Sequence, residues 1–99
     1  MNRKKIIYSI LKEIQQGNEP KRDDYGLELE QWGEICELIR DEGLASNVVV
    51  QRGGIGNKVV YAWLSKAKIT FKGLDFLEEN SALAKTYKGL KKIRDWLKL

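Results

Sequence analysis

Histidine is absent from the chain, and cysteine, proline and methionine each occur once among its 99 residues. Without histidine there is neither an imidazole general base nor a histidine metal ligand. The single cysteine, Cys36, excludes an intramolecular disulfide. Long apolar runs are missing too, since none approaches the roughly 20 residues that a membrane-spanning helix needs. We therefore expect a protein that is not an enzyme, holds no cofactor or metal, and does not enter a membrane.

The N-terminal sequence MNRKKIIYSIL places basic residues before apolar ones, as a signal peptide does. Lys12 and Glu13 end the apolar run after six residues, and no small-residue cleavage site follows. A chain of this length buries roughly 65% of its unfolded surface, enough for one core without cross-links. We therefore expect a single domain over residues 1–99, located in the cytoplasm.

Charge is distributed in three blocks along the chain. Residues 1–22 carry six basic and two acidic side chains, residues 23–43 carry one basic and eight acidic, and residues 44–99 carry eleven basic and four acidic. Such asymmetry bears on partners and on electrostatic steering rather than on fold. The blocks point to opposite partners, a nucleic acid for the basic ones and a basic protein surface for the acidic one.

Apolar residues recur with helical spacing in the first half of the chain. The pattern predicts helices over residues 3–16, 20–25 and 29–42, each followed by a glycine that can end it. Leu44 is expected to fold back onto the third helix. The inward face of that helix is predicted to carry Trp32, Ile35, Cys36 and Ile39. Cys36 is therefore expected to be a buried small hydrophobe and not a nucleophile.

Segments rich in valine and aromatic residues flank a glycine-rich tip, Gly53–Asn57, and predict a β-hairpin over residues 48–64. Along its second strand, alternation with period two places Val59, Tyr61 and Trp63 on one face. Val60, Ala62 and Leu64 then share the other face. Sequence does not decide which face points inward, and either choice leaves aromatic or aliphatic side chains exposed.

Thr70 is the predicted N-cap of a fourth helix that ends at Asn80, because its hydroxyl can accept a hydrogen bond from a nearby backbone amide. Phe71, Leu74 and Leu77 are expected to be buried.

Ser81 is expected to cap a last helix over residues 82–97, which is amphipathic and basic. Its apolar stripe consists of Leu83, Tyr87, Leu90, Ile93 and Leu97. This helix either packs on the first helix of a monomer or pairs with a second copy in a homodimer. Trp96 lies off the stripe and is expected to be exposed or at an interface.

Three helices, a hairpin and two helices form the order of a winged helix-turn-helix domain, a mainly α-helical fold with one β-hairpin (α+β). The segment ITFKGLDFLEEN (69–80) looks like the junction that follows the wing in bacterial winged-helix regulators. Together with KKIIYSILKEIQQGNEP and AKTYKGLKKIRDWLKL at the two ends, it resembles the YjcQ-like family of small bacterial and prophage proteins. The resemblance implies a winged-helix fold. It implies no functional residues, because the family has no established activity.

Two candidate surfaces follow from this fold. In a winged helix-turn-helix protein the third helix enters the major groove of DNA. Its outward stripe here is acidic and would repel phosphates; it consists of Glu30, Glu34, Glu37 and Asp41. A regulator that binds double-stranded DNA would instead contact the backbone through Arg52, Lys58, Lys66, Lys68 and Lys72. The alternative is a protein-interaction module, which docks the acidic stripe on a basic partner or the wing aromatics on an apolar one. A simpler alternative applies to both the acidic stripe and the basic residues: they are ordinary charged side chains that face solvent and bind no partner.

Overall fold

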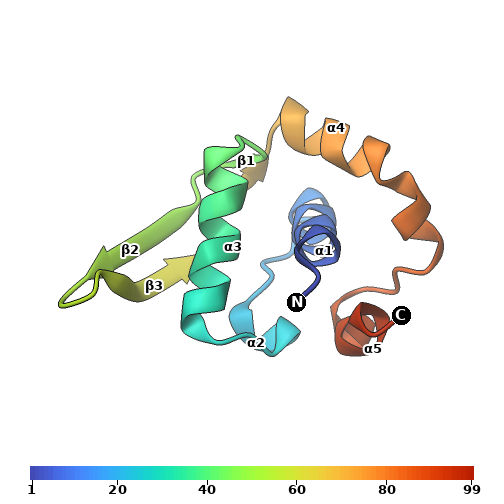
Figure 1. Ribbon diagram of the computed structural model, residues 1–99. Coiled ribbons are helices and arrows are strands. Elements are labelled where there is room, and N and C mark those ends of the chain that lie inside the picture. Colours follow the sequence, from blue (N-terminus) through green and yellow to red (C-terminus); the bar gives the residue numbers. More distant parts are fainter.

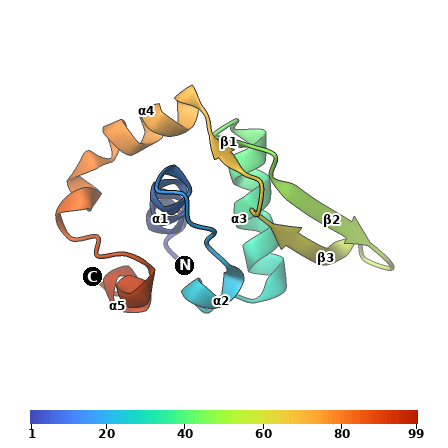
Figure 2. The same cartoon turned by 180° about the vertical axis from the view of Figure 1, so that it is seen from behind.

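Helix α1 (Arg3–Gln15) lies at the centre of the structure, and the other helices surround it (Figures 1 and 2). The computed structural model describes all residues, 1–99, as a mixed α+β fold. Ile6, Ile7, Ile10 and Leu11 of α1 are buried, as the apolar spacing of this segment predicts. The core is therefore built around the first helix of the chain.

Helices α2 (Arg22–Tyr25) and α3 (Leu29–Asp41) follow α1, close to the predicted positions. Gly26 ends α2 in the left-handed conformation, with φ of 64°, which glycine adopts without strain. After α3, the Leu44 amide donates to the Ile39 carbonyl at 2.9 Å and the Leu44 side chain is buried. This confirms that the chain folds back at Gly43.

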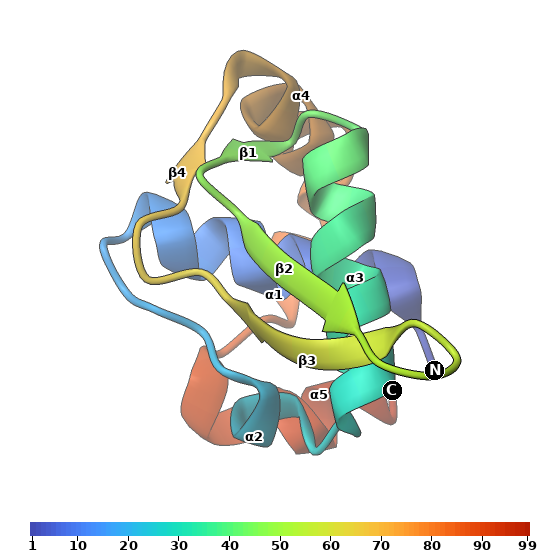
Figure 3. The same cartoon turned by 90° about the vertical axis from the view of Figure 1, so that its left-hand side faces the viewer.

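Strands β2 (Val49–Gly53) and β3 (Lys58–Trp63) form the predicted antiparallel hairpin, which projects beside α3 (Figures 1 and 3). Two further strands, β1 (Ala45–Ser46) and β4 (Lys68–Ile69), pair with each other at the base of the hairpin. Sequence analysis missed this second pair, because two residues are too few to show an alternating pattern.

A β-bulge at Val60 changes the predicted alternation along β3. Gln51 pairs with Tyr61 and Arg52 with Val59, so Val60 has no partner on β2. The extra residue turns Val59 inward, where it is 7% exposed, and leaves Val60 56% exposed. The prediction that Val59 shares a face with Tyr61 and Trp63 was therefore wrong. The face that carries Tyr61 and Trp63 is the outward one, since both side chains are exposed.

Helix α4 (Phe71–Glu79) begins at the predicted cap, since Thr70 Oγ1 accepts from the Gly73 amide at 3.1 Å. Leu77 is buried as expected, but Phe71 is 87% exposed and Leu74 37% exposed. The buried stripe of α4 runs through Gly73 and Leu77. At 100° per residue Phe71 lies on the opposite side of the helix, so the prediction that it is buried was wrong.

The predicted continuous helix over residues 82–97 does not form. The segment consists of two 3₁₀ turns, η1 (Ser81–Lys85) and η2 (Leu90–Lys92), and the short helix α5 (Ile93–Leu97). Gly89, with φ of 93°, separates them and lets the chain bend around α1 (Figure 2). Trp96 was predicted to be exposed or at an interface, but it is buried within the chain at 3% exposed, and its Nε1 donates to Thr86 Oγ1 at 2.7 Å. The long amphipathic helix on which the homodimer alternative rested is therefore absent, and the choice between monomer and homodimer stays a prediction.

Candidate interaction surfaces

Arg52, one of the predicted DNA contacts, lies against helix α3. Its Nε and Nη2 donate to the two carboxylate oxygens of Glu37 at 2.8 and 2.7 Å, and its Nη1 donates to Glu30 at 3.3 Å. The second oxygen of Glu30 accepts the backbone N–H of Val59 at 2.5 Å. One arginine on β2 and two glutamates on α3 thus bind the hairpin to the helix.

This ion cluster joins residues that sequence analysis had assigned to two opposing surfaces. The hydrogen bonds from Arg52 hold the pKa of Glu37 below its usual range, so this carboxylate stays charged near neutral pH. A bidentate pair of this kind is the strong form of the arginine–carboxylate interaction. Arg52 is therefore not free to bind a phosphate. Glu30 and Glu37 are likewise not free to dock on a basic partner.

The other predicted contacts remain exposed, but they do not form one patch. Glu34 is exposed and has no ion pair, whereas Asp41 lies 3.0 Å from Arg40. The four lysines among the predicted DNA contacts are exposed and have no ion pair; they are Lys58, Lys66, Lys68 and Lys72. Lys58 is the first residue of β3, whereas the other three lysines follow the end of this strand. At about 3.3 Å per residue the six residues of β3 span roughly 17 Å. The lysines near β4 and the start of α4 are thus a separate group.

Two aromatic side chains dominate the outer face of the hairpin. The rings of Tyr61 and Trp63 are stacked, with centroids 4.3 Å apart and planes 9° apart. They are 37% and 44% exposed, and neither the Tyr61 hydroxyl nor the Trp63 indole N–H has a hydrogen-bond partner. Buried or interfacial tyrosine and tryptophan normally use these polar tips. The pair is therefore an apolar surface with two unused hydrogen-bonding groups.

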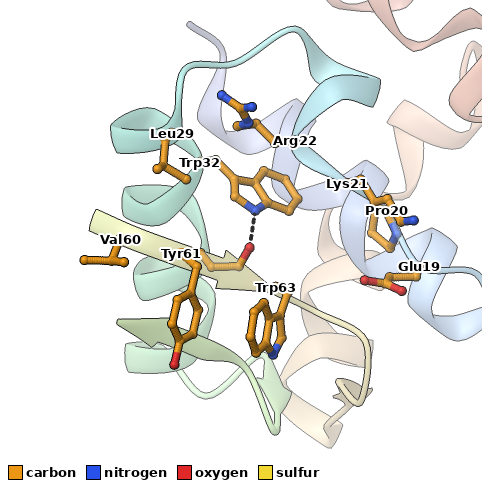
Figure 4. A pocket seen from close by; sticks show the side chains of 10 residues that line it. Glu19, Pro20, Lys21, Arg22, Leu29, Trp32, Val60, Tyr61 and Trp63 are labelled. Carbon is orange, nitrogen blue, oxygen red and sulfur yellow. Dashed lines mark hydrogen bonds between the residues drawn. The ribbon is translucent and has the colours of Figure 1, made fainter. Parts of the chain in front are cut away.

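A groove of about 250 Å³ lies between this strand and the loop that leads into α2 (Figure 4). It is lined by residues 19–22, by Leu29 and Trp32 of α3, and by residues 60–63 of β3. Trp32 is held in place because its Nε1 donates to the Ala62 carbonyl at 2.9 Å. Figure 4 shows Tyr61 and Trp63 side by side on one side of Trp32, with Arg22 on the other side. The groove is thus mainly apolar, with three aromatic side chains among its ten lining residues and two basic residues at its rim.

Comparison with known proteins agrees with the resemblance seen at the chain ends and the wing junction. The family model described as "YjcQ protein" matches residues 8–96. The chain belongs to the YjcQ family. A similar protein, "Uncharacterized protein YjcQ" of Bacillus subtilis (strain 168), is 32% identical over 99 residues, which cover 99% of this chain and 100% of the relative. No solved structure matches. Family membership is thus confirmed, and the name of the relative assigns no activity.

A buried polar network in this YjcQ-family chain escaped sequence analysis. Glu13 of α1 is 4% exposed; it accepts from the Tyr87 hydroxyl at 2.5 Å and from Asn18 Nδ2 at 2.9 Å. Ser9 is fully buried and contacts the hydroxyls of Tyr25 and Tyr87 at 2.9 and 2.8 Å. Since Tyr87 gives its only proton to Glu13, Ser9 must donate to Tyr87 and accept from Tyr25. The signal was present in the sequence as two polar residues, four apart, within an apolar helix.

The network attaches the C-terminal segment to α1. Burial, together with the Glu13 contact, raises the pKa of Tyr87 above its ordinary value, and burial does the same for Tyr25. Both phenols therefore stay protonated as donors. Because every buried side-chain polar atom has a partner, the network favours one position of the segment around Tyr87.

Three features bear on the expectations about catalysis and location. Burial raises the pKa of the Cys36 thiol to about 12, which keeps it protonated and unreactive. No three acidic or cysteine side chains lie close enough together to hold a metal ion. None of the helices has both the length and the apolar character needed to cross a membrane. The absence of enzymatic activity and the cytoplasmic location remain predictions.

Proposed function

We propose that this YjcQ-family chain is a winged-helix binding module that recognises another protein through the outer face of hairpin β2–β3. The order α1–α2–α3, hairpin, α4 supports the winged-helix assignment. The main support for the proposal is that hydrogen bonds to Glu37 hold the Arg52 side chain against α3. With its arginine turned to the helix, the hairpin presents Val60, Tyr61 and Trp63 to solvent.

The chemistry of this outer face suits a protein partner better than a phosphate backbone. Tyrosine and tryptophan are enriched at protein interfaces and are common among the residues that carry most of the binding energy. Helix α3, which would have to enter the major groove, exposes Glu34 and Asp41. Carboxylates on that face oppose DNA along the groove.

The proposal is tested by cross-linking and direct binding. A photo-reactive residue in place of Tyr61 should cross-link one protein in the native host, whereas the same residue at exposed Lys91 should not. The identified partner is then purified and titrated against the chain. We expect Trp63→Ala to weaken binding at least tenfold with an unchanged circular dichroism spectrum, and Lys91→Ala to leave it unchanged. Binding that resists Trp63→Ala but is lost in Glu34→Lys with Asp41→Lys would overturn the proposal and place the interface on α3.

Double-stranded DNA is a second candidate, favoured by the unpaired lysines Lys66, Lys68 and Lys72. Labelled protein is titrated with mixed-sequence duplex at low and moderate salt. If these lysines contact phosphates, changing all three to glutamate should reduce the slope of log affinity against log salt by about 2.7, at about 0.9 per contact. The matched control changes Lys85, Lys91 and Lys98. Equal effects of both triple variants, or no binding at low salt, would remove specific DNA contact by this group.

A further inference from the structure

The groove beside the Tyr61–Trp63 pair has the composition of a peptide site. Six of its ten lining residues are hydrophobic, including Trp32 of α3 and Ala62 of β3, and Pro20 of the loop before α2 also lines it. Trp32 and Pro20 are buried, and the hydrogen bond from Trp32 to Ala62 fixes the indole, so the groove exists before any partner arrives. Pre-formed apolar grooves with a few polar groups are the usual form of binding sites.

Strand addition, the simplest way to bind an extended peptide, is hindered along β3. The Val59 N–H is bonded to Glu30 and the Ala62 carbonyl accepts from Trp32 Nε1. A peptide that paired with this edge would have to displace both side chains. A partner must therefore be recognised through its side chains and through the free polar tips of Tyr61 and Trp63.

A polyproline II segment satisfies these conditions. It has no internal hydrogen bonds, so its carbonyls are free to accept from the Trp63 indole N–H and the Tyr61 hydroxyl. Its proline rings pack on aromatic surfaces, and its preformed backbone loses little entropy on binding. Neither donor is used within the chain. The site thus supplies aromatic surface and donors in the combination that such a segment needs.

Charge at the rim selects among such segments. Lys21 and Arg22 are exposed at the edge of the groove, against the single acid Glu19. The carboxylate of Asp23 lies 3.8 Å from the guanidinium of Arg22. Because both side chains are exposed, this ion pair contributes little energy. We infer, on the basis of the proposed function, that the groove binds a proline-rich segment of another protein that carries an acidic residue.

The test uses the whole ¹⁵N-labelled chain, whose three tryptophans provide three indole N–H signals. The probe is a synthetic proline-rich peptide that contains glutamates. One matched peptide has lysine in place of glutamate, and another has glycine and serine in place of proline. We expect the Trp63 signal to shift saturably with the first peptide. The signal of Trp96, whose buried indole donates to Thr86 Oγ1, should not move.

Comparison of the three peptides shows whether the groove recognises proline and negative charge. Loss of proline should weaken binding at least tenfold, and the exchange of glutamate for lysine should weaken it at least threefold. Lys21→Glu with Arg22→Glu should reverse the preference between the glutamate and lysine peptides, an effect that mere loss of stability cannot produce. Lys58→Glu, outside the groove, is the matched control and should retain the original preference.

Four results would overturn the inference: no saturable shift of Trp63, equal binding of the glycine-serine peptide, an unchanged charge preference in the double variant, or a shift with single-stranded oligothymidylate in place of the peptide. The proposed function fails separately. If a purified partner needs Trp63 but proline-rich peptides do not shift its signal, the groove inference is wrong and the hairpin interface stands. If the partner does not need Trp63, the hairpin interface itself is wrong.

Discussion

Replacing Gly73 with alanine should destabilise the protein, although alanine is the better helix former. Gly73 lies in the first turn of α4, where it packs against the chain after α3. A Cβ atom at this position would lie 2.1 Å from the Leu44 carbonyl oxygen and 2.6 Å from Ile69 Cγ1. The Leu44 oxygen is part of the backbone and already accepts the Thr70 N–H at 3.2 Å. The contact can be relieved only if α4 moves away.

The size of the effect follows from three terms, one stabilising and two destabilising. Alanine in place of glycine within a helix stabilises by about 1 kcal/mol. Overpacking costs about 1–3 kcal/mol, and loss of the Thr70–Leu44 hydrogen bond costs about 1 kcal/mol more. The net destabilisation is then about 2 kcal/mol when the overpacking lies near the middle of its range. For a domain of this length that lowers Tm by about 8–16 °C.

Thermal and urea unfolding, followed by circular dichroism, measure this change. Asp75→Ala, at an exposed position of the same helix, is the matched control and should leave stability unchanged or slightly higher. If Gly73→Ala were as stable as the parent chain or more stable, helix propensity would outweigh the contact. The close approach of α4 to Leu44 would then be wrong.

Three further perturbations test the packing and the charges. Gly33→Ala should lower the free energy of unfolding by up to about 2 kcal/mol, because its Cβ would lie 2.4 Å from Val59 Cγ2 and the overpacking cost of about 1–3 kcal/mol is offset by about 1 kcal/mol of helix propensity; adding Val59→Ala should recover part of the loss. Because Arg52 lowers the pKa of Glu37, their pair stabilises the fold above the unfolded pKa of glutamate, and this contribution is lost as pH falls through the lowered folded pKa. In Glu37→Gln the free energy of unfolding, measured with urea at several pH values, should therefore fall less steeply as the pH is lowered. An unchanged dependence on pH would show that the Arg52–Glu37 ion pair does not stabilise the fold. Tyr87→Phe should cost about 1–3 kcal/mol in the same assay, because it leaves a buried carboxylate short of a donor.

The Thr-x-Lys-Gly segment shows how a family resemblance acquires a physical meaning. Thr70 caps α4 and its hydroxyl also donates to the Gly43 carbonyl at 2.5 Å. Gly73 is needed because its neighbour is a backbone oxygen. The segment therefore serves to join α4 to the end of α3. Packing therefore accounts for Thr70 and Gly73 in this segment, and neither residue needs a role in binding.

The first three helices, the hairpin and the Thr70 cap could be predicted from the sequence, because they depend on interactions between residues close together in the chain. Apolar spacing, glycine ends and capping hydroxyls act within a few residues, so they can be recognised without the rest of the chain. The same reasoning failed over residues 82–97, where helical periodicity was present but the chain bends at Gly89. There the burial of Trp96 and the bond between Tyr87 and Glu13 outweigh propensity.

The candidate site was decided almost entirely by tertiary structure. The sequence identified Arg52 and the acidic stripe as charged residues, but not that Arg52 and Glu37, fifteen positions apart, bind each other. It identified Tyr61 and Trp63 as wing aromatics, but only the packing of β3 against α3 shows that they face outward. Helix ends and strand segments depend on neighbours along the chain, whereas ion pairing, exposure and grooves depend on residues that only folding brings together.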